Sequence, residues 1–154
     1  MKDKLYRAFV DATQNVFKLM LNISEICDHP SDNFSCDNEV DIAIGVVGDL
    51  QGEVVYRFPV STSLNMVNIM SGMKFEEVDA FVTSAISEIA NIISGNVLTE
   101  LSASDLKCDR LPPVQRKPGE DPNKDKEYEL KTSCHINTSI GEIGLEIRLN
   151  KVKG

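Results

Sequence analysis

The chain has 154 residues, of which 42% are hydrophobic and 26% charged, with a formal net charge of −8 and a pI near 4.7. These values predict one soluble globular domain over residues 1–154, and the acidic balance argues against nucleic acid or an anionic membrane as a partner. No run approaches the roughly 18 apolar residues of a membrane helix, and the charged N-terminus lacks a signal peptide's apolar region. We therefore expect a cytoplasmic protein.

The cysteines are scattered without a C-x-x-C pair, so without an export signal we expect reduced thiols. His29 and His135 lie near two of them in sequence, but the paired ligand spacings of a zinc site are missing. Nothing in the sequence orients either histidine toward a thiol, as nucleophilic Cys/His catalysis requires. The four cysteines are Cys27, Cys36, Cys108 and Cys134.

Residues 3–23 carry an apolar side chain every three or four positions, which predicts a first amphipathic helix. Asp11 and Asn15 on its polar side are expected to be solvated. Residues 24–37 contain turn-forming residues and predict a turn or a frayed edge strand. The side chains predicted to point inward are Leu5, Phe9, Ala12, Val16, Leu19, Met20 and Ile23.

Residues 40–46 alternate apolar with polar or small side chains, and the chain returns as a second strand over residues 53–58. The intervening turn, Gly48-Asp49-Leu50-Gln51-Gly52, leads into a strand rather than a helix N-terminus. We interpret this turn as scaffold and not as a phosphate-binding loop.

A short helix follows Pro59, with Ser61 or Thr62 as its predicted cap, and it closes at Gly72. Its inward side chains are expected to be Leu64, Val67 and Met70. The methionines Met66, Met70 and Met73 are expected to fill gaps in the core rather than to line a binding groove.

Residues 76–101 predict the helix around which the chain is organised. The acidic side chains at its start suit the positive end of the helix dipole. The apolar side consists of Val82, Ile86, Ile89, Ile93, Val97 and Leu101.

A short strand is predicted over residues 105–110, and the proline-rich segment 112–125 is predicted to be a mobile loop with Arg116 and Lys117 solvated. Two strands, 126–137 and 142–150, complete the chain. The sum is an α+β fold, in which three helices pack on an antiparallel or mixed sheet, without the strand–helix–strand period of a doubly wound fold.

The polar side of the 76–101 helix contains small or polar residues and neither lysine nor arginine. A plain solvent-exposed face is the commoner interpretation of such a pattern, and a recognition or catalytic face is the alternative. Glu88 and Asn91, three residues apart, would project from adjacent turns into one cleft of a partner. The residues on this side are Ser84, Ser87, Glu88, Asn91, Ser94 and Gly95.

The run Ser84-x-x-x-Glu88-x-x-Asn91, followed by Ile-Ile-Ser-Gly-Asn, resembles the signature of the CheC/CheX/FliY phosphatases of bacterial chemotaxis. The glycine-bounded turn at residues 48–52 resembles that family's hairpin turn.

The first helix is also similar to that of CheX-type proteins, in which it reads much like Phe-x-Glu-Ala-Thr-x-Asn-Val-Phe. Two-site CheC proteins carry a Glu-x-x-Asn motif in this helix. The chain lacks that motif here, because Asp11 and Asn15 are four residues apart instead of three. The matching residues are Phe9, Asp11, Ala12, Thr13, Asn15, Val16 and Phe17.

The resemblance implies a CheC/CheX-like layer of helices on a mostly antiparallel sheet, and homodimers that join sheet edges. It implies hydrolysis of the aspartyl phosphate on a CheY-like response regulator. Asn91 would position the attacking water, and Glu88 would pair with a lysine of the regulator. The contact would include Ser84, Ser87, Ser94 and Gly95. No cofactor of its own is expected, since a divalent metal, Mg²⁺ by preference, would belong to the regulator's site.

Two other functions stay open. The same fold can serve as a non-catalytic module that binds a response regulator, as in a flagellar switch. A small-molecule-binding α+β domain is the second alternative. It would need an apolar pocket with convergent polar groups, and the sequence offers no such cluster.

Overall fold

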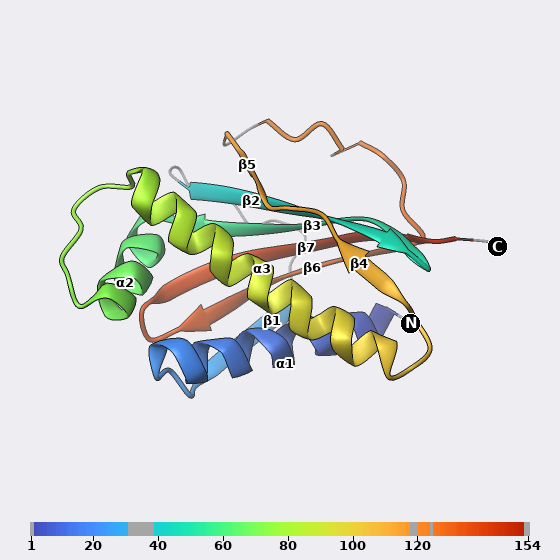
Figure 1. The fold of residues 1–154 in the computed structure, drawn as a ribbon, viewed down its shortest axis with the longest axis horizontal. Coiled ribbons are helices and arrows are strands. Elements are labelled where there is room, and N and C mark those ends of the chain that lie inside the picture. Colours follow the sequence, from blue (N-terminus) through green and yellow to red (C-terminus); the bar gives the residue numbers. More distant parts are fainter. Residues whose placement is uncertain (1, 31–38, 118–119, 124, 153–154) are drawn as a thin grey trace.

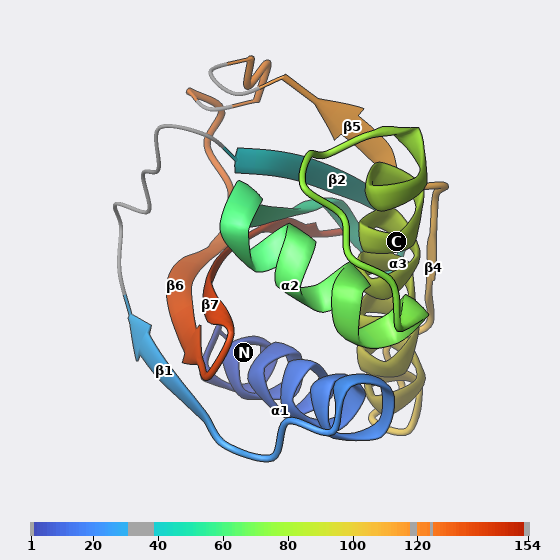
Figure 2. The same ribbon diagram turned by 90° about the vertical axis from the view of Figure 1, so that its left-hand side faces the viewer.

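A computed structural model describes residues 2–30, 39–117, 120–123 and 125–152, and within these ranges three helices lie on one face of a curved seven-stranded sheet (Figure 1, Figure 2). This arrangement confirms the predicted α+β fold. The helices are α1 (Lys2–Leu21), α2 (Val60–Ser71) and α3 (Ala80–Ser102). The strands are β1 (Ile26–Pro30), β2 (Glu39–Gly48), β3 (Leu50–Pro59), β4 (Cys108–Arg110), β5 (Val114–Arg116), β6 (Leu130–Thr138) and β7 (Gly141–Lys151).

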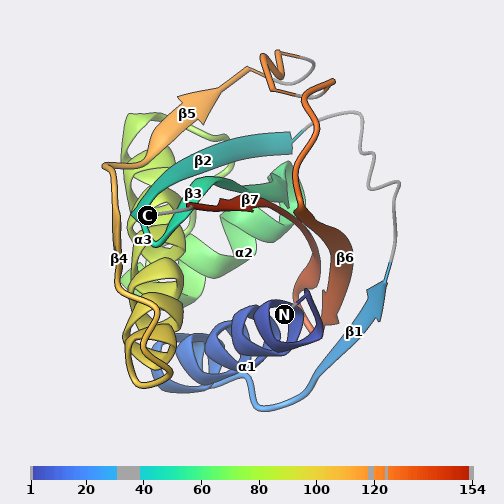
Figure 3. The ribbon, with the colours of Figure 1, turned by 90° about the vertical axis from the view of Figure 1, so that its right-hand side faces the viewer.

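The strand order is β1-β6-β7-β3-β2-β4, and β5 also pairs with β2. All pairings are antiparallel. Strand β1 therefore forms one edge of the sheet, while β4 and β5 follow one another along the opposite edge (Figure 3). For residues 24–37 a turn or a frayed edge strand was predicted, and β1 is an edge strand, while residues 31–37 lie outside the described residues.

Helix α3 begins at Ala80, because the Asp79 side chain accepts a hydrogen bond from the backbone N–H of Val82 at 2.9 Å and caps the helix. Glu76 and Glu77 precede the helix, so the predicted start was four residues early. The apolar side lies in the core as predicted. Its buried residues are Val82, Ile86, Ile89, Ala90, Ile93, Ser94, Val97, Leu98 and Leu101.

This core helix is also long and apolar enough to span a membrane by length and composition, with a mean hydropathy of 1.3 over its most apolar window. It is not a continuous apolar run, however, because polar side chains such as Thr83, Glu88 and Asn91 interrupt it. Burial of one side against the sheet, α1 and α2 accounts for the apolar composition of α3.

The β2–β3 hairpin is tighter than predicted, with only Asp49 between the strands. Its tip holds the chain that leads into β4: the Asp49 carboxylate accepts from the backbone N–H of Lys107 at 2.7 Å, and the Asp49 N–H donates to the Lys107 carbonyl at 3.0 Å. Gly48 has a φ of 117°, and a Cβ there would lie 2.5 Å from the same carbonyl. A glycine is therefore required at this position.

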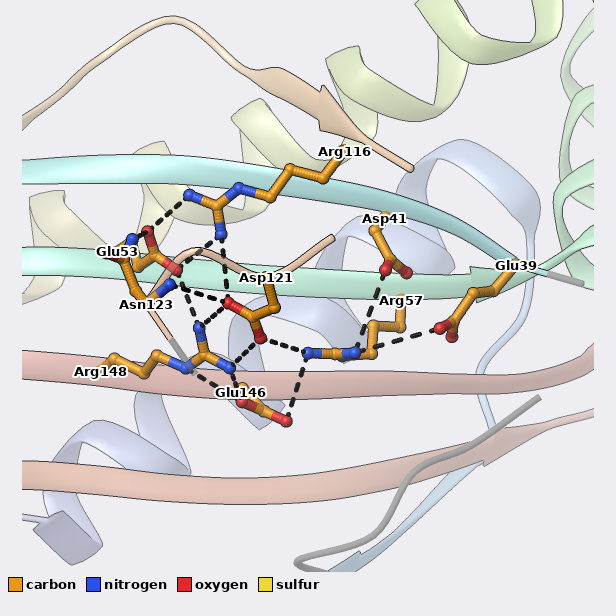
Figure 4. Close-up of polar contacts among 9 residues, drawn as sticks. All are labelled: Glu39, Asp41, Glu53, Arg57, Arg116, Asp121, Asn123, Glu146 and Arg148. Atoms are coloured by element: carbon orange, nitrogen blue, oxygen red, sulfur yellow. Dashed lines mark hydrogen bonds and ion pairs between the residues drawn. The ribbon is translucent and has the colours of Figure 1, made fainter. Parts of the chain in front are cut away.

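The sheet face opposite the helices carries a network of ion pairs (Figure 4). Arg148, 1% exposed, donates to both carboxylate oxygens of Asp121 at 2.7 and 2.6 Å and to Glu53 at 3.0 Å. Arg116 in β5 donates to both oxygens of Glu53 at 2.8 and 2.7 Å. The network therefore holds the chain around β5 against β3 and β7.

This network corrects the prediction for residues 112–125. Residues 114–116 form strand β5 because they pair with β2, and Arg116 is an ion-pair partner instead of a solvated side chain. Lys117 is exposed, as expected. Residues 118, 119 and 124 of the predicted loop lie outside the described residues.

Two carboxyl groups of the network have pKa values shifted in opposite directions. Hydrogen bonds from Arg148 lower the pKa of Asp121 to about 2, so its contribution to stability is lost as the pH falls from about 4 toward 2. Burial, helped by the neighbouring Asp41, raises the pKa of Glu39 from 4.5 to about 7. The contribution of Glu39 to the stability of the fold is present below pH 4.5 and is lost as the pH rises through 7.

Several local predictions also differ from the structure. Helix α1 ends at Leu21, and the predicted core residues Leu19 and Met20 are exposed, because Phe17 and Leu21 are the side chains that the last turn buries in the core. Met73 is exposed rather than core, since it follows the end of α2. Strand β6 begins at Leu130, four residues later than predicted.

The predicted cap of the second helix is also wrong. Pro59 occupies the cap position of α2 without a side-chain hydrogen bond. Thr62 lies inside the helix, where its hydroxyl donates to the carbonyl of Glu142 in β7 at 2.9 Å.

The substitution Arg148→Met should lower the free energy of unfolding by roughly 3–5 kcal/mol, because it leaves buried carboxylates without their guanidinium partner. Urea unfolding of the two proteins measures this difference. Arg7→Met is the matched control: its guanidinium is exposed, and its long ion pairs with Asp11 and Asp28 should contribute less than about 1 kcal/mol. Equal losses for the two variants would contradict a stabilising role for the network.

Candidate functional site

The structure places Glu88 and Asn91 together on the side of α3 that faces away from the core. Glu88 is exposed, and Asn91 is half-buried but accessible from outside. Ser84 is exposed one turn before Glu88, and Ser87 is half-buried. Among the ion pairs of the described residues none includes Glu88, so its carboxylate is available to a cation on another molecule.

Arg110 is a site residue that the sequence analysis missed. Its Nε–H donates a hydrogen bond to Oδ1 of Asn91 at 2.7 Å. Strand β4 brings it there through its pairing with β2, in which Arg110 lies opposite Val46. Arg110 falls in the predicted strand 105–110, but no local sequence pattern places a residue of that strand beside position 91.

The same guanidinium covers Gly95. A Cβ built at Gly95 would lie 2.7 Å from Nη1 and 2.9 Å from Cζ of Arg110. Gly95 therefore provides space for Arg110, and its surface faces this side chain rather than open solvent.

The expectation that Ser94 lies on the exposed side with Asn91 is wrong. Ser94 is 2% exposed, and its hydroxyl lies 2.7 Å from the hydroxyl of Tyr56 in β3. It follows the buried Ala90 by one turn, so it faces the sheet. Burial raises the pKa of Tyr56, which keeps this phenol protonated and able to donate to Ser94.

On α1, Asp11 and Asn15 are both exposed, as expected for a structural helix. They line an open hollow between α1 and the far end of α3, together with Asn96 and Glu100. These two α3 residues project from a different side of the helix than Asn91, so the hollow is separate from the Glu88/Asn91 side.

The described residues contain no cluster of side chains suited to a metal site. Within the described ranges no three histidine, cysteine, aspartate or glutamate side chains are arranged to bind a metal ion. His29 and His135 are neighbours across β1 and β6, with ring centroids 5.2 Å apart. Cys27, Cys108 and Cys134 are free thiols, and Cys36 lies outside the described residues.

Comparison with known sequences identifies the family. The sequence model described as chemotaxis phosphatase CheX matches residues 40–129, more than half of the chain and including the whole of α3, β4 and β5. The chain belongs to the CheX family.

Its relatives agree with this assignment. The chain is 25% identical over 117 residues to the CheY-P phosphatase CheX of Thermotoga maritima, a match that covers 74% of this chain and 76% of that protein. The fold is similar to the crystal structure of chemotaxis protein CheX from Vibrio vulnificus, with a TM-score of 0.81, 21% identity and coverage of 95% of this chain and 99% of that one.

A second structural relative is the CheX–CheY–BeF3–Mg²⁺ complex from Borrelia burgdorferi. Its TM-score is 0.77 at 21% identity, with 95% of this chain and 97% of that chain covered. These structural likenesses confirm that the CheX-family fold extends through α1 and the last strands, beyond the residues that the sequence model matches.

The substitution Ser94→Ala should lower the free energy of unfolding by about 1–3 kcal/mol, because the buried Tyr56 hydroxyl then has no partner. Thermal or urea unfolding measures the loss. Combining it with Tyr56→Phe should destabilise less than the sum of the two single changes. Ser84→Ala, an exposed change on the same helix, should stay within about 0.5 kcal/mol. A similar loss for both serine variants would contradict the burial of Ser94.

Proposed function

We propose that this protein hydrolyses the aspartyl phosphate of a CheY-like response regulator, and that the Asn91 amide positions the attacking water. One observation supports this most: Glu88 and Asn91 lie on adjacent turns of a core helix, reachable from outside, in a chain of the CheX family.

The reaction needs position more than covalent chemistry. An aspartyl phosphate is a mixed anhydride, so water attack on phosphorus breaks the bond to the aspartyl oxygen and releases inorganic phosphate and a free carboxylate. The Asn91 amide can accept from and donate to one water molecule, which holds that water in line with the breaking bond. No covalent intermediate on this protein is required.

Glu88 is assigned the role of anchor. Its exposed carboxylate would pair with a lysine ammonium of the regulator beside the phosphoryl group. A carboxylate suits this role, because a charge-assisted hydrogen bond in a half-desolvated contact requires an anion opposite the cation. The pairing would place Asn91 over the phosphorus and draw the lysine toward α3.

The contact surface continues along the same side of α3. Ser84 and Ser87 are small and would let the backbone of the regulator approach closely. Phe81, one turn before Ser84, is 57% exposed and stacks on Phe75. An exposed aromatic ring next to polar residues is typical of a protein interface.

The proposal assigns no cofactor to this chain. The divalent metal, Mg²⁺ by preference, would be held by the regulator, where it neutralises the phosphoryl oxygens during the attack. We also infer that the protein works in the cytoplasm, where its response regulator would be phosphorylated.

Asn91→Ala should reduce the rate of dephosphorylation at saturating phosphatase by roughly 100-fold or more, because the water loses its positioning amide. Binding of the phosphorylated regulator should change little. Asn91→Asp should be equally poor, since a second negative charge would face the phosphoryl group. Release of inorganic phosphate from a phosphorylated regulator measures the rate.

In the same assay Glu88→Ala should act mainly on binding and raise the half-saturation concentration. Asn96→Ala, an exposed amide on another side of α3, should retain wild-type activity. Full activity of Asn91→Ala would refute this mechanism. A wild-type protein that binds the phosphorylated regulator without shortening its lifetime would indicate a non-catalytic module.

We further propose that two copies of the chain pair along a sheet edge. An open edge presents unpaired backbone groups, which a second copy can cover. The edge strands β1 and β4/β5 are the candidates. Sedimentation or light scattering should then give twice the mass of one 17.0 kDa chain. A monomer at micromolar concentration would contradict this proposal.

A further inference from the structure

The contact between Arg110 and Asn91 has features that a chance surface contact lacks. The donor is charged, and the 2.7 Å distance from Nε to Oδ1 is short for an N–H···O bond. Both side chains are half-buried. The guanidinium lies over the turn of α3 at Gly95, in space that any other residue at that position would occupy. Gly95 lies inside the helix, where glycine is unfavourable relative to alanine, so its presence is explained by the room it leaves.

The strand does not need this side chain to stay in place. The backbone of β4 pairs with β2 from Cys108 to Arg110, and the next residue, Leu111, donates its N–H to the carbonyl of Gly45 at 2.9 Å. The ion pairs formed by the described residues do not include Arg110. Its guanidinium is therefore committed to α3 and not to a carboxylate of the fold.

We propose that Arg110 is the positioning residue of Asn91, holding the amide in the orientation that catalysis uses before the regulator arrives. The inference rests on the proposed function of Asn91. A primary amide turns easily about its last torsion, and its two ends then exchange places. The Arg110 bond fixes the oxygen end on the β4 side. One lone pair of Oδ1 and both N–H groups of Asn91 stay available to the water and the phosphoryl group.

This arrangement prepares the amide in the free protein. The torsional freedom of Asn91 is lost on folding, so it need not be lost again in the transition state. The positive charge also polarises the amide and makes its N–H groups better donors. Both effects act on the rate of the bound complex and not on the affinity for the regulator.

Arg110→Ala should reduce the dephosphorylation rate at saturation by roughly 10- to 100-fold, with the half-saturation concentration changed by less than about threefold. Arg110→Lys should behave like Arg110→Ala, although it keeps the charge, because an ammonium cannot reproduce the sideways Nε–H donor. Lys107→Ala removes an exposed positive charge three residues earlier and serves as the control. It should leave the saturated dephosphorylation rate and the half-saturation concentration unchanged.

Gly95→Ala tests the same contact without altering Arg110. The added methyl group would displace the flexible end of the guanidinium, and alanine favours the helix, so the protein should fold. It should lower the saturated rate as Arg110→Ala does. In an Asn91→Ala background, Arg110→Ala should cause less than about a twofold further change, because the two residues act as one unit.

Side-chain amide NMR provides a readout that does not depend on activity. The Asn91 amide signals, identified by their loss in Asn91→Ala, should shift and exchange with water faster in Arg110→Ala. A wild-type protein without phosphatase activity would refute the proposed function. The Asn91 amide signals would then still test whether Arg110 holds the Asn91 side chain in place. Unchanged Asn91 signals in Arg110→Ala, or full activity of that variant beside an inactive Asn91→Ala, would overturn the inference. A raised half-saturation concentration with an unchanged saturated rate would overturn it too, because it would assign Arg110 to docking.

Discussion

The burial of one side of α3 is the constraint on which the candidate site depends. Turning the helix to bring Asn91 inward would expose the isoleucines and valines that contact the sheet. Each exposed side chain would cost about 1.5–3 kcal/mol of folding free energy. The helix therefore cannot rotate in place, and Glu88 and Asn91 keep a fixed direction. A surface that positions one water molecule needs this rigidity more than it needs reactive side chains.

The second part of the site comes from the edge of the sheet. Three separate contacts place Arg110 beside Asn91: the pairing of β4 with β2, the hydrogen bonds between Asp49 and Lys107 at the hairpin tip, and the bond from Leu111 to Gly45. On the far side of the sheet the ion pairs of Arg116 hold the strand that follows. The fold thus fixes the chain on both sides of Arg110.

The charges of the protein divide into two groups with different surroundings. On the outer sheet face, arginines and carboxylates pair with one another in partly buried positions, where an unpaired ion would be costly. On the α3 side, Glu88 and Arg110 take no part in the ion pairs of the described residues. Charges that the fold does not use remain available for another molecule or, as we infer for Arg110, for a neighbouring amide.

The sequence alone was sufficient for the features that repeat along the chain. The spacing of Val82, Ile86 and Ile93 predicted the buried side of α3 and the outward direction of Glu88, and strand alternation predicted the β2–β3 hairpin. Only the tertiary structure revealed the burial of Ser94 on Tyr56, the pairing of β5 with β2 and the contact from Arg110 to Asn91. Periodicity reports which side of an element is apolar. It does not report which distant residue that side meets, because such contacts join segments tens of residues apart and are set by the packing of the whole chain.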